Sequence, residues 1–309
     1  MMPVKVKYSI IGALIGGAIV FSAGLFSNTE VNNEDRNVTL LPEKQNNGKI
    51  TGYKAPGSIS FAGEEVPLHR ADVLEKLERE VMVNAFWHSN SVILIKRANK
   101  YLPTIDSILV ANDIPADFKY LAVAESGLDN VISPARAVGF WQFLKGTARD
   151  FGLVVNKDID QRYDPFLATV AATKYLKEAH EKFGNWTTVA ASYNLGMTGA
   201  KKIIEAQKSD TYYDMIMSEE PSRYVFRVLA LKNMLENPSN YGFDIPTEEK
   251  YFLPKTKSVE ISKSIVDLHE FAKTNNVSYY QLRYLNPWIR NYQLPVRPGQ
   301  KFEIKLPIE

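Results

Sequence analysis

The spacing of apolar residues predicts helices through most of the chain. Val73, Leu77 and Val81 recur at one-turn spacing, as expected for a helix with one buried face. Pro103 is expected to open a further helix that contains Ile105, because proline is tolerated in a first helical turn. These patterns indicate an all-α body.

Two later helices are predicted from the signals at their ends. Asp164 followed by Pro165 is typical of a helix start, and Gly184 is typical of the end of the same helix. Ser218 begins a second helix, which Asn237 ends. Its apolar face holds Tyr224, Val228, Leu231 and Leu235.

The character of the chain changes after these helices. Pro246 and Pro254 flank a short aromatic segment, and the alternation over 302–306 predicts a strand after the turn at 296–300. The expected fold class is therefore mainly α, with an all-α domain at 66–245 and a small α+β module at 246–309.

The N-terminal region differs from both of these parts. Lys5 and Lys7 precede an uncharged run over 10–26, and acidic residues follow it. This asymmetry predicts a signal peptide or an uncleaved membrane anchor at 1–27, with the rest of the chain on the outer side of the membrane. The sequence leaves both readings open. Residues 28–65 are polar and are expected to form a flexible linker.

Composition excludes several classes of function. The net charge of +2 among 309 residues is too small for a nucleic-acid binder. The chain has no Cys, so a disulfide, a zinc-thiolate site and a bacterial lipoprotein anchor are excluded. The four His are far apart in sequence and lack metal-ligand spacing, so we expect neither a metal nor a cofactor.

Glu125 is the strongest candidate for a catalytic residue. It stands in register with Phe118, Leu121 and Ala122, so its carboxyl projects from the apolar face of a helix that Gly127 is expected to end. Burial and the helix C-terminus both disfavour the ionised form, so we predict a raised pKa, as a general acid requires. The alternative is a Glu at a helix end that simply reaches water.

Two further clusters carry polar and aromatic side chains. In the segment Gly139 to Phe143, Trp141 and Phe143 could stack on sugar rings while Gln142 donates and accepts hydrogen bonds. Taken in isolation, such a run more often consists of ordinary core aromatics. In the segment 192–196, Tyr193 and Asn194 place a phenol and a carboxamide at a predicted helix end.

Taken together and in this order, the clusters resemble the catalytic domain of the soluble lytic transglycosylase family, which is related to goose-type lysozyme. The resemblance covers about residues 110–235. Its motifs are the Glu125-Ser126 pair, the Gly139 to Gln142 segment, the 192–196 segment, in which Ser192 replaces the usual Ala, and the pair Tyr224-Val225. The run from Phe86 to Asn99 is similar to the membrane-bound lytic murein transglycosylase D branch.

The resemblance implies a lyase that acts on glycan strands of peptidoglycan in the cell envelope, on the periplasmic side. Glu125 would cleave the β-1,4 bond between N-acetylmuramic acid and N-acetylglucosamine and leave 1,6-anhydro ends. Tyr193, Asn194 and Tyr224 would hold the acetamido group and the acid, with Ser126 and Gln142 helping to position them. A lysozyme-like hydrolase would instead need an Asp to activate water. The candidates are Asp129, Asp150 and Asp164.

The tail at 246–309 is similar to a LysM module. The similarity lies in its central residues from Phe271 to Asn286 and in the turn from Pro298 to Phe302. The Gly-Asp-Thr-Leu start that is usual in LysM is replaced by Val259 to Ser262. An alternative of a different class is a catalytically silent glycan-binding or scaffold protein.

Overall fold

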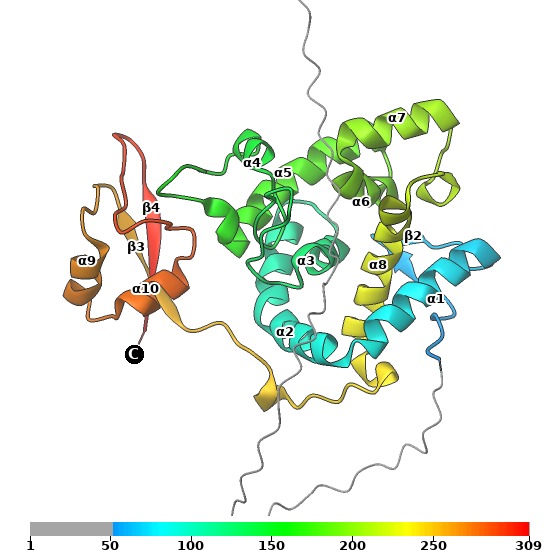
Figure 1. Ribbon diagram of the computed structural model, residues 1–309, viewed down its shortest axis with the longest axis horizontal. Coiled ribbons are helices and arrows are strands. Elements are labelled where there is room, and N and C mark those ends of the chain that lie inside the picture. The colour runs from blue at the N-terminus through cyan, green and yellow to red at the C-terminus, as the bar shows by residue number, and fades with distance from the viewer. Residues whose placement is uncertain (1–51, 309) are drawn as a thin grey trace, which may run out of the picture. The chain divides into compact units, whose positions relative to one another are not determined.

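The computed structural model describes residues 52–308, and Figure 1 shows how their elements are arranged. The predicted N-terminal signal or anchor at 1–27 lies outside these residues, as do positions 28–51 of the expected linker. Over the described part, no helix has the length and apolar character needed to cross a membrane.

The first long helices follow the predicted pattern, with one correction. In α1 (Ala71–Phe86), Val73, Leu77 and Val81 are all buried. The helix α2 runs over His88–Ala111 and contains Pro103 in its interior, so the expectation that Pro103 opens a helix is wrong. A proline inside a helix costs about 3 kcal/mol. The buried positions of α2 continue on both sides of the proline, and their packing offsets this cost. They are Ser91, Leu94, Ile95, Ala98, Ile105 and Leu109.

The central helices carry the segments that sequence patterns single out. They are α3 (Lys119–Ser126), α4 (Lys145–Asp150), α5 (Pro165–Phe183) and α6 (Trp186–Leu195). The predicted ends of α5 are confirmed, because the Asp164 carboxylate accepts bonds from two backbone N–H groups of its first turn and Gly184 adopts a φ of 74° after its last residue. Short 3-10 helices complete the described part. They are η1 (Ala116–Phe118), η2 (Gln161–Tyr163), η3 (Tyr212–Asp214), η4 (Pro238–Tyr241) and η5 (Thr247–Glu249).

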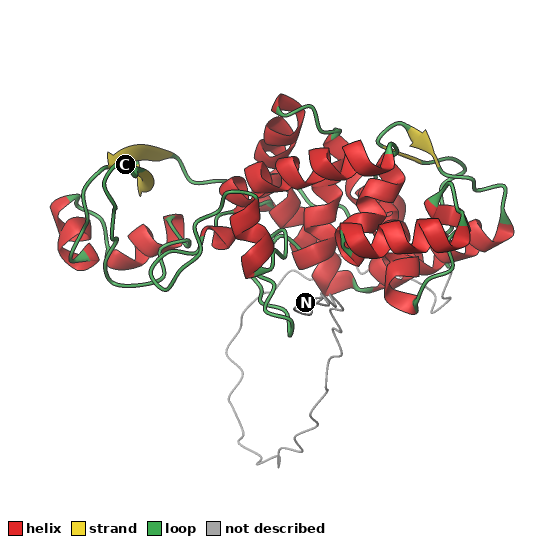
Figure 2. Cartoon of the chain, turned by 90° about the horizontal axis from the view of Figure 1, so that it is seen from above, coloured by secondary structure: helices red, strands yellow, loops and turns green. Residues whose placement is uncertain are grey.

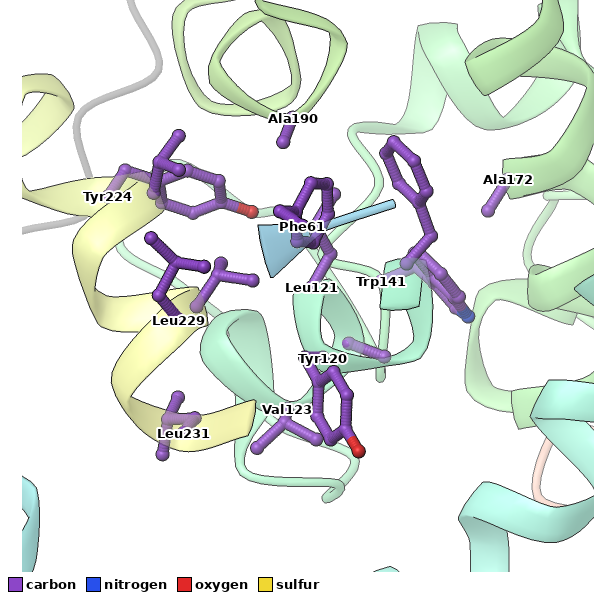
Figure 3. Close-up of a cluster of buried hydrophobic side chains, with 14 of the residues drawn as sticks. Phe61, Tyr120, Leu121, Val123, Trp141, Ala172, Ala190, Tyr224, Leu229 and Leu231 are labelled. Atoms are coloured by element: carbon purple, nitrogen blue, oxygen red, sulfur yellow. The ribbon is translucent and has the colours of Figure 1, made fainter. Parts of the chain in front are cut away.

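Two further helices close the body. They are α7 (Met197–Gln207) and α8 (Glu219–Glu236). Helix α8 packs against α1, α3 and α6, and α2 packs against α3 and α5. Figure 3 shows the result: Leu121 on α3, Tyr224 on α8 and Trp141 lie in the same buried cluster. The predicted helical body is confirmed.

The body begins earlier in the chain than the apolar pattern predicts. A small hairpin pairs β1 (Ser60–Phe61) with β2 (Glu64–Glu65). The Phe61 side chain is fully buried and stacks edge-on against Phe118 at 5.0 Å. Glu64 accepts hydrogen bonds from the backbone N–H groups of Trp186 and Thr187 at the start of α6. Residues 53–65 are therefore packed on the body, where a flexible linker was expected.

The tail forms a small α+β unit with its own core. Strands β3 (Thr256–Ile261) and β4 (Phe302–Pro307) pair antiparallel, with Thr256 opposite Pro307 and Ile261 opposite Phe302. Helices α9 (Leu268–Thr274) and α10 (Tyr279–Leu285) lie between them in sequence. Within the described chain, strands occur only in the β1–β2 pair and the β3–β4 pair, which are yellow in Figure 2. The strand at the C-terminus was predicted, whereas β3 was not.

One loop of the body packs into the core of the tail. Ile159 is 1 % exposed and belongs to the hydrophobic core of the tail, although it precedes α5 in the chain. The Asp160 N–H donates to the Trp288 carbonyl at 2.8 Å, and the Arg290 N–H donates to the Asp158 carbonyl at 2.7 Å. Residues from Tyr53 onward accordingly form one compact unit.

Candidate active site

Glu125 lies in the last turn of α3, next to the buried face of the helix. Phe118, Leu121 and Ala122, which share its face, are fully buried, as the spacing predicts. Gly127 ends the helix with a φ of 61°, a left-handed conformation that glycine adopts without strain. The Glu125 side chain itself is partly buried, so its carboxyl lies among apolar groups while keeping some access to solvent.

The environment of this carboxyl favours its protonated form. Burial raises the pKa of Glu125 from 4.5 to about 7, against the opposing effects of a hydrogen bond from Tyr224 and the positive charge of Arg227. Water solvates a carboxylate far better than a protein interior does, so removing water favours the neutral acid. The predicted rise in pKa agrees with this environment, and the acid is half protonated near neutral pH.

Tyr224 supplies the only side-chain hydrogen bond to this carboxyl from within the described chain. Its hydroxyl donates to Glu125 Oε1 at 2.6 Å. Tyr224 is 1 % exposed and comes from α8, so two helices far apart in sequence meet at this bond. Burial and the neighbouring Glu125 raise the pKa of Tyr224 well above its ordinary value, so the phenol remains a donor.

Two charged groups on α8 change the pKa of the Glu125 carboxyl in opposite directions. Arg227 donates two hydrogen bonds of 2.9 Å to the carboxylate of Glu220. It also lies 3.9 Å from Glu80, a carboxylate that is 1 % exposed. The positive charge of Arg227 lowers the pKa of Glu125, and the negative charge of Glu220 raises it. The sequence analysis missed both residues, although Arg227 stands one helical turn after Tyr224.

Tyr193 lies near the end of α6 and faces the same region. Its hydroxyl donates to the backbone carbonyl of Trp141 at 2.7 Å. Burial raises the pKa of Tyr193 well above its ordinary value, and the charge of Glu125 adds to this effect. The electrostatic effect of Glu125 on both Tyr193 and Tyr224 indicates that the three side chains share one site.

Asn194 presents an unused hydrogen-bond acceptor. Its Oδ1 atom is buried and has no hydrogen-bond partner in the described part of the chain. Buried polar atoms are nearly always paired, so an orphaned acceptor on the residue that follows Tyr193 indicates a place where a ligand can donate. The amide N–H of an acetamido sugar is such a donor.

The segment Gly139 to Phe143 forms the wall behind Tyr193. Trp141 is fully buried and its indole N–H donates to Thr169 Oγ1 at 2.9 Å. Phe143 is 3 % exposed, and its ring centroid lies 6.2 Å from that of Tyr193. The rings of Trp141 and Phe143 therefore pack inside the body and do not lie open for stacking on a sugar.

The backbone of this segment is held in a restricted geometry. Gly139 has a φ of 80°, and a Cβ at this position would lie 2.0 Å from the carbonyl oxygen of Arg162. Gln142 has a φ of 45°, and its side-chain amide donates to the carbonyls of Gly139 and Val131 at 2.7 and 3.2 Å. Only glycine fits at position 139, because the backbone of Arg162 leaves no room for a Cβ. The side-chain amide of Gln142 holds the loop through its two hydrogen bonds.

Ser126 lies beside the acid but turns back onto its own helix. The Ser126 hydroxyl donates to the Ala122 carbonyl at 3.0 Å. Its contact in this structure is thus with the backbone of α3.

A buried ion pair holds the segment Gly139 to Phe143 on its inner side. Sequence patterns do not reveal this pair. Arg162 is 7 % exposed and forms a two-point pair with Asp160, with distances of 2.9 and 2.7 Å. It also donates to the carbonyls of Phe143 and Arg136, at 3.0 and 3.2 Å. The only sequence signal was a pair of opposite charges two residues apart, which is common in proteins.

Two of the three carboxylates that a hydrolase could use are engaged in other contacts. Asp164 caps α5 by accepting from Phe166 and Leu167 N–H groups. Asp129 accepts from Arg97 at 2.6 Å. Asp150 is exposed at the end of α4. No group of three potential metal ligands occurs within residues 52–308.

Comparison with known proteins identifies both parts of the chain. Residues 111–216 match the transglycosylase SLT domain, and residues 257–309 match the soluble lytic transglycosylase C-terminal LysM-like domain. Membrane-bound lytic murein transglycosylase D from Escherichia coli strain K12 is 26% identical over 245 residues, which cover 76% of this chain. The same protein from strain CFT073 matches equally. The chain spans about half the length of these curated relatives, 52% of each.

A solved structure gives a more distant likeness. An X-ray structure of an inactive mutant of the lytic transglycosylase Slt from Pseudomonas aeruginosa matches with a TM-score of 0.36 and 16% sequence identity, over 60% of this chain and 36% of that one. The domain matches bracket the residues described above, from Glu125 to Asn194. By its two family matches, the chain carries a transglycosylase SLT domain at 111–216 followed by a soluble lytic transglycosylase C-terminal LysM-like domain at 257–309.

Proposed function

We propose that the chain is a peptidoglycan lytic transglycosylase that cleaves the bond between N-acetylmuramic acid and N-acetylglucosamine and leaves 1,6-anhydro ends. The observation that carries this proposal is Glu125, a carboxyl with a pKa of about 7 that accepts a hydrogen bond from Tyr224. An acid with a pKa near neutrality can both donate and accept a proton during one reaction cycle. The matched SLT domain supports the same activity.

In the first step, Glu125 donates its proton to the glycosidic oxygen as the bond to C1 of the muramic acid breaks. Tyr224 already bonds Oε1, so we assign the transferred proton to Oε2. The acetamido group of the muramic acid supplies electrons to C1 and stabilises the positive charge. The Tyr224 hydroxyl stabilises the carboxylate that remains, because a hydrogen bond to a charged group is stronger than one to a neutral group.

In the second step, the Glu125 carboxylate accepts the proton of the sugar's own C6 hydroxyl. The C6 oxygen attacks C1, the 1,6-anhydro ring closes, and Glu125 is again protonated. No water is consumed, so no second carboxylate is required. This agrees with the engagement of Asp164 as a helix cap and of Asp129 with Arg97.

The remaining site residues act around this pair. We propose that Asn194 Oδ1 accepts from the acetamido N–H and that Tyr193 orients the same group. Trp141 and Phe143 support Tyr193 from the interior, while Gln142 and Gly139 fix the loop. Ser126 holds the end of α3 beside the acid.

The product distinguishes a lytic transglycosylase from a hydrolase. Purified glycan strands would be digested with the full chain, and the released muropeptides measured by mass spectrometry. We expect anhydro ends, which are one water molecule lighter than the reducing ends a hydrolase leaves. Glu125→Gln should abolish cleavage. Reducing ends would establish a hydrolase, and intact strands with both proteins would indicate a binding protein.

We further propose that the chain acts in the cell envelope, on the periplasmic side. The asymmetry of charge around residues 10–26 supports export or anchoring at 1–27, and the E. coli relative is named as membrane-bound. N-terminal sequencing of the protein from membrane and soluble fractions would separate a cleaved signal from a retained anchor. For the domains we propose a catalytic body that begins near residue 53 and a LysM-like module from 246.

A further inference from the structure

A second cleft, of about 530 Å³, opens beside the C-terminal end of α3. Its lining comes from α2, from the residues that follow α3, from the connection to β3 and from α10. The lining residues that carry charge or an aromatic ring are Arg97, Lys100, Tyr101, Asp129, Lys250, Tyr251, Phe252 and Tyr284. We call this the α2 cleft.

The connection that forms one side of the α2 cleft is fixed along α2. The Tyr251 N–H donates to the Lys96 carbonyl at 3.3 Å, and the Asn99 side chain donates to the Tyr251 carbonyl at 2.9 Å. Lys96 also pairs with Glu249 at 3.5 Å. This connection is the gold segment that leads to β3 in Figure 1, and these bonds hold it along α2.

The charge of the α2 cleft is positive. It contains three cations and one carboxylate, and that carboxylate, Asp129, is paired with Arg97 at 2.6 Å. Neither Lys100 nor Lys250 forms an ion pair with any residue between 52 and 308. Burial lowers the pKa of Lys100, but Tyr284, which accepts its hydrogen bond, and Tyr101 together raise this pKa above its ordinary value, so the side chain stays charged.

The α2 cleft adjoins the candidate active site at two points. Arg97 donates to the carbonyl of Gly127, the residue that ends the helix of Glu125, at 3.2 Å. The ring of Tyr101 stacks edge-on against Phe140, in the wall behind Tyr193, with centroids 4.8 Å apart. The α2 cleft therefore lies next to the end of the helix that carries Glu125 and next to the segment behind Tyr193.

We infer that the α2 cleft binds the carboxylates of the peptide stem that hangs from the muramic acid, with Lys100 and Lys250 as the cations that contact them. This inference rests on the proposed function and specifies its substrate. The sugar rings carry no charge where the lactyl group is joined to peptide, whereas the stem carries free carboxylates. Ammonium groups without a carboxylate partner suit such a ligand, and the aromatic rings around them limit competing water.

The test compares two substrates. Glycan strands that bear uncrosslinked peptide stems, and the same strands stripped of peptide by an amidase, would be digested with the full chain. For the wild type we expect kcat/KM to be about tenfold higher on peptide-bearing strands, a difference of about 1.4 kcal/mol, because charge-assisted hydrogen bonds to the stem carboxylates stabilise the bound substrate. In the Lys100→Gln, Lys250→Gln double variant this ratio should fall to near one, while Lys100→Arg retains it.

Controls separate a local from a general effect. Lys177→Gln, which removes an exposed lysine of α5, should keep the wild-type ratio. An unchanged ratio in the double variant, or an equal loss on both substrates, would overturn the inference. If the wild type cleaves neither substrate, the proposed function fails. In that case, a calorimetric titration of the Glu125→Gln chain compares its affinity for a peptide-bearing disaccharide with its affinity for the bare disaccharide. Tighter binding of the peptide-bearing form would support the α2 cleft as the binding site of the stem, and equal affinities would overturn it.

Discussion

Tyr224 and Glu125 lie 99 positions apart in sequence and are joined by a 2.6 Å hydrogen bond. The phenol donates to the carboxyl, so the bond is stronger when the carboxyl is ionised. Burial acts in the opposite direction and prevails, which leaves the pKa of Glu125 at about 7. The balance between these two effects sets the pH range over which the acid is available.

The first prediction concerns the pH dependence of cleavage. The reaction begins with protonated Glu125, so kcat/KM should fall as the pH rises through about 7. Well above that value, each further pH unit should lower kcat/KM about tenfold, because one proton is lost from one group. Initial rates of strand cleavage from pH 5 to 9 would measure this. A profile that stays flat to pH 9 would contradict the assignment of Glu125 as the acid.

The second prediction concerns Tyr224→Phe. Removing the hydroxyl removes a bond that lowers the pKa of Glu125, so the alkaline limb of the profile should move to higher pH. The rate should fall about 10- to 100-fold, since a hydrogen bond to a charged group contributes about 1.5 to 3 kcal/mol. Tyr212→Phe is the matched control, because this buried phenol donates to the Pro221 carbonyl instead. Equal shifts in both variants would contradict the prediction.

The third prediction concerns stability and pH in Glu125→Gln. The folded-state pKa of about 7 exceeds the ordinary 4.5, so Glu125 leaves folding unaffected below pH 4.5, destabilises the fold progressively as the pH rises from 4.5 to 7, and has its full effect above 7. This difference in pKa corresponds to about 3 kcal/mol at most. Urea unfolding should therefore show Glu125→Gln to be more stable than the wild type at pH 8, with little difference at pH 4. Equal stability at pH 8 would indicate a solvated carboxyl.

The fourth prediction separates binding from folding at Asn194. Asn194→Ala removes a buried acceptor that has no partner in the described chain, so the free energy of unfolding should stay the same or rise. Cleavage should fall about 10- to 100-fold, because the acetamido N–H loses an acceptor worth about 1 to 3 kcal/mol. In contrast, Asn185→Ala removes the cap of α6 and should lower stability with a smaller effect on cleavage. The reverse pattern would exclude a binding role for Asn194.

The fifth prediction concerns the N-terminal hairpin. Glu64 accepts hydrogen bonds from the N–H groups of Trp186 and Thr187, so Glu64→Gln should lower the free energy of unfolding by about 1 kcal/mol through loss of a charged helix cap. Glu65→Gln, at the neighbouring exposed position, should leave it unchanged. Denaturant titration of both variants checks this. No difference between them would mean that the hairpin contributes little to α6.

Local signals in the sequence were sufficient for the ends of α5 and for the apolar face beside Glu125. Asp164 and Gly184 mark the two ends of α5 through caps that depend on neighbouring residues alone. Glu125 could be found because its helical face is set by the spacing to Leu121 and Ala122. Pro103 was misplaced because its local preference for a helix start is outweighed by apolar residues on both sides of it.

Contacts between distant segments could not be predicted in the same way. The hairpin at 60–65 is too short to show a period, and Phe61 is buried only because it meets Phe118. Arg227 acts on Glu125 through the packing of α8 on α3. Trp141 was expected to face a sugar, yet its N–H reaches Thr169 inside the body. Each of these depends on which elements meet in space, and neighbouring sequence does not specify that.

The place of Ile159 has a consequence for how the chain unfolds. This residue belongs by sequence to the SLT domain but lies in the core of the tail, at 1 % exposure. A chain cut before residue 250 would leave an isoleucine and the carbonyl of Asp158 in water beside the Asp160–Arg162 pair. Heating the intact protein should therefore melt both domains in one cooperative transition, and the truncated body should lose rigidity first in the loop that carries Gln142.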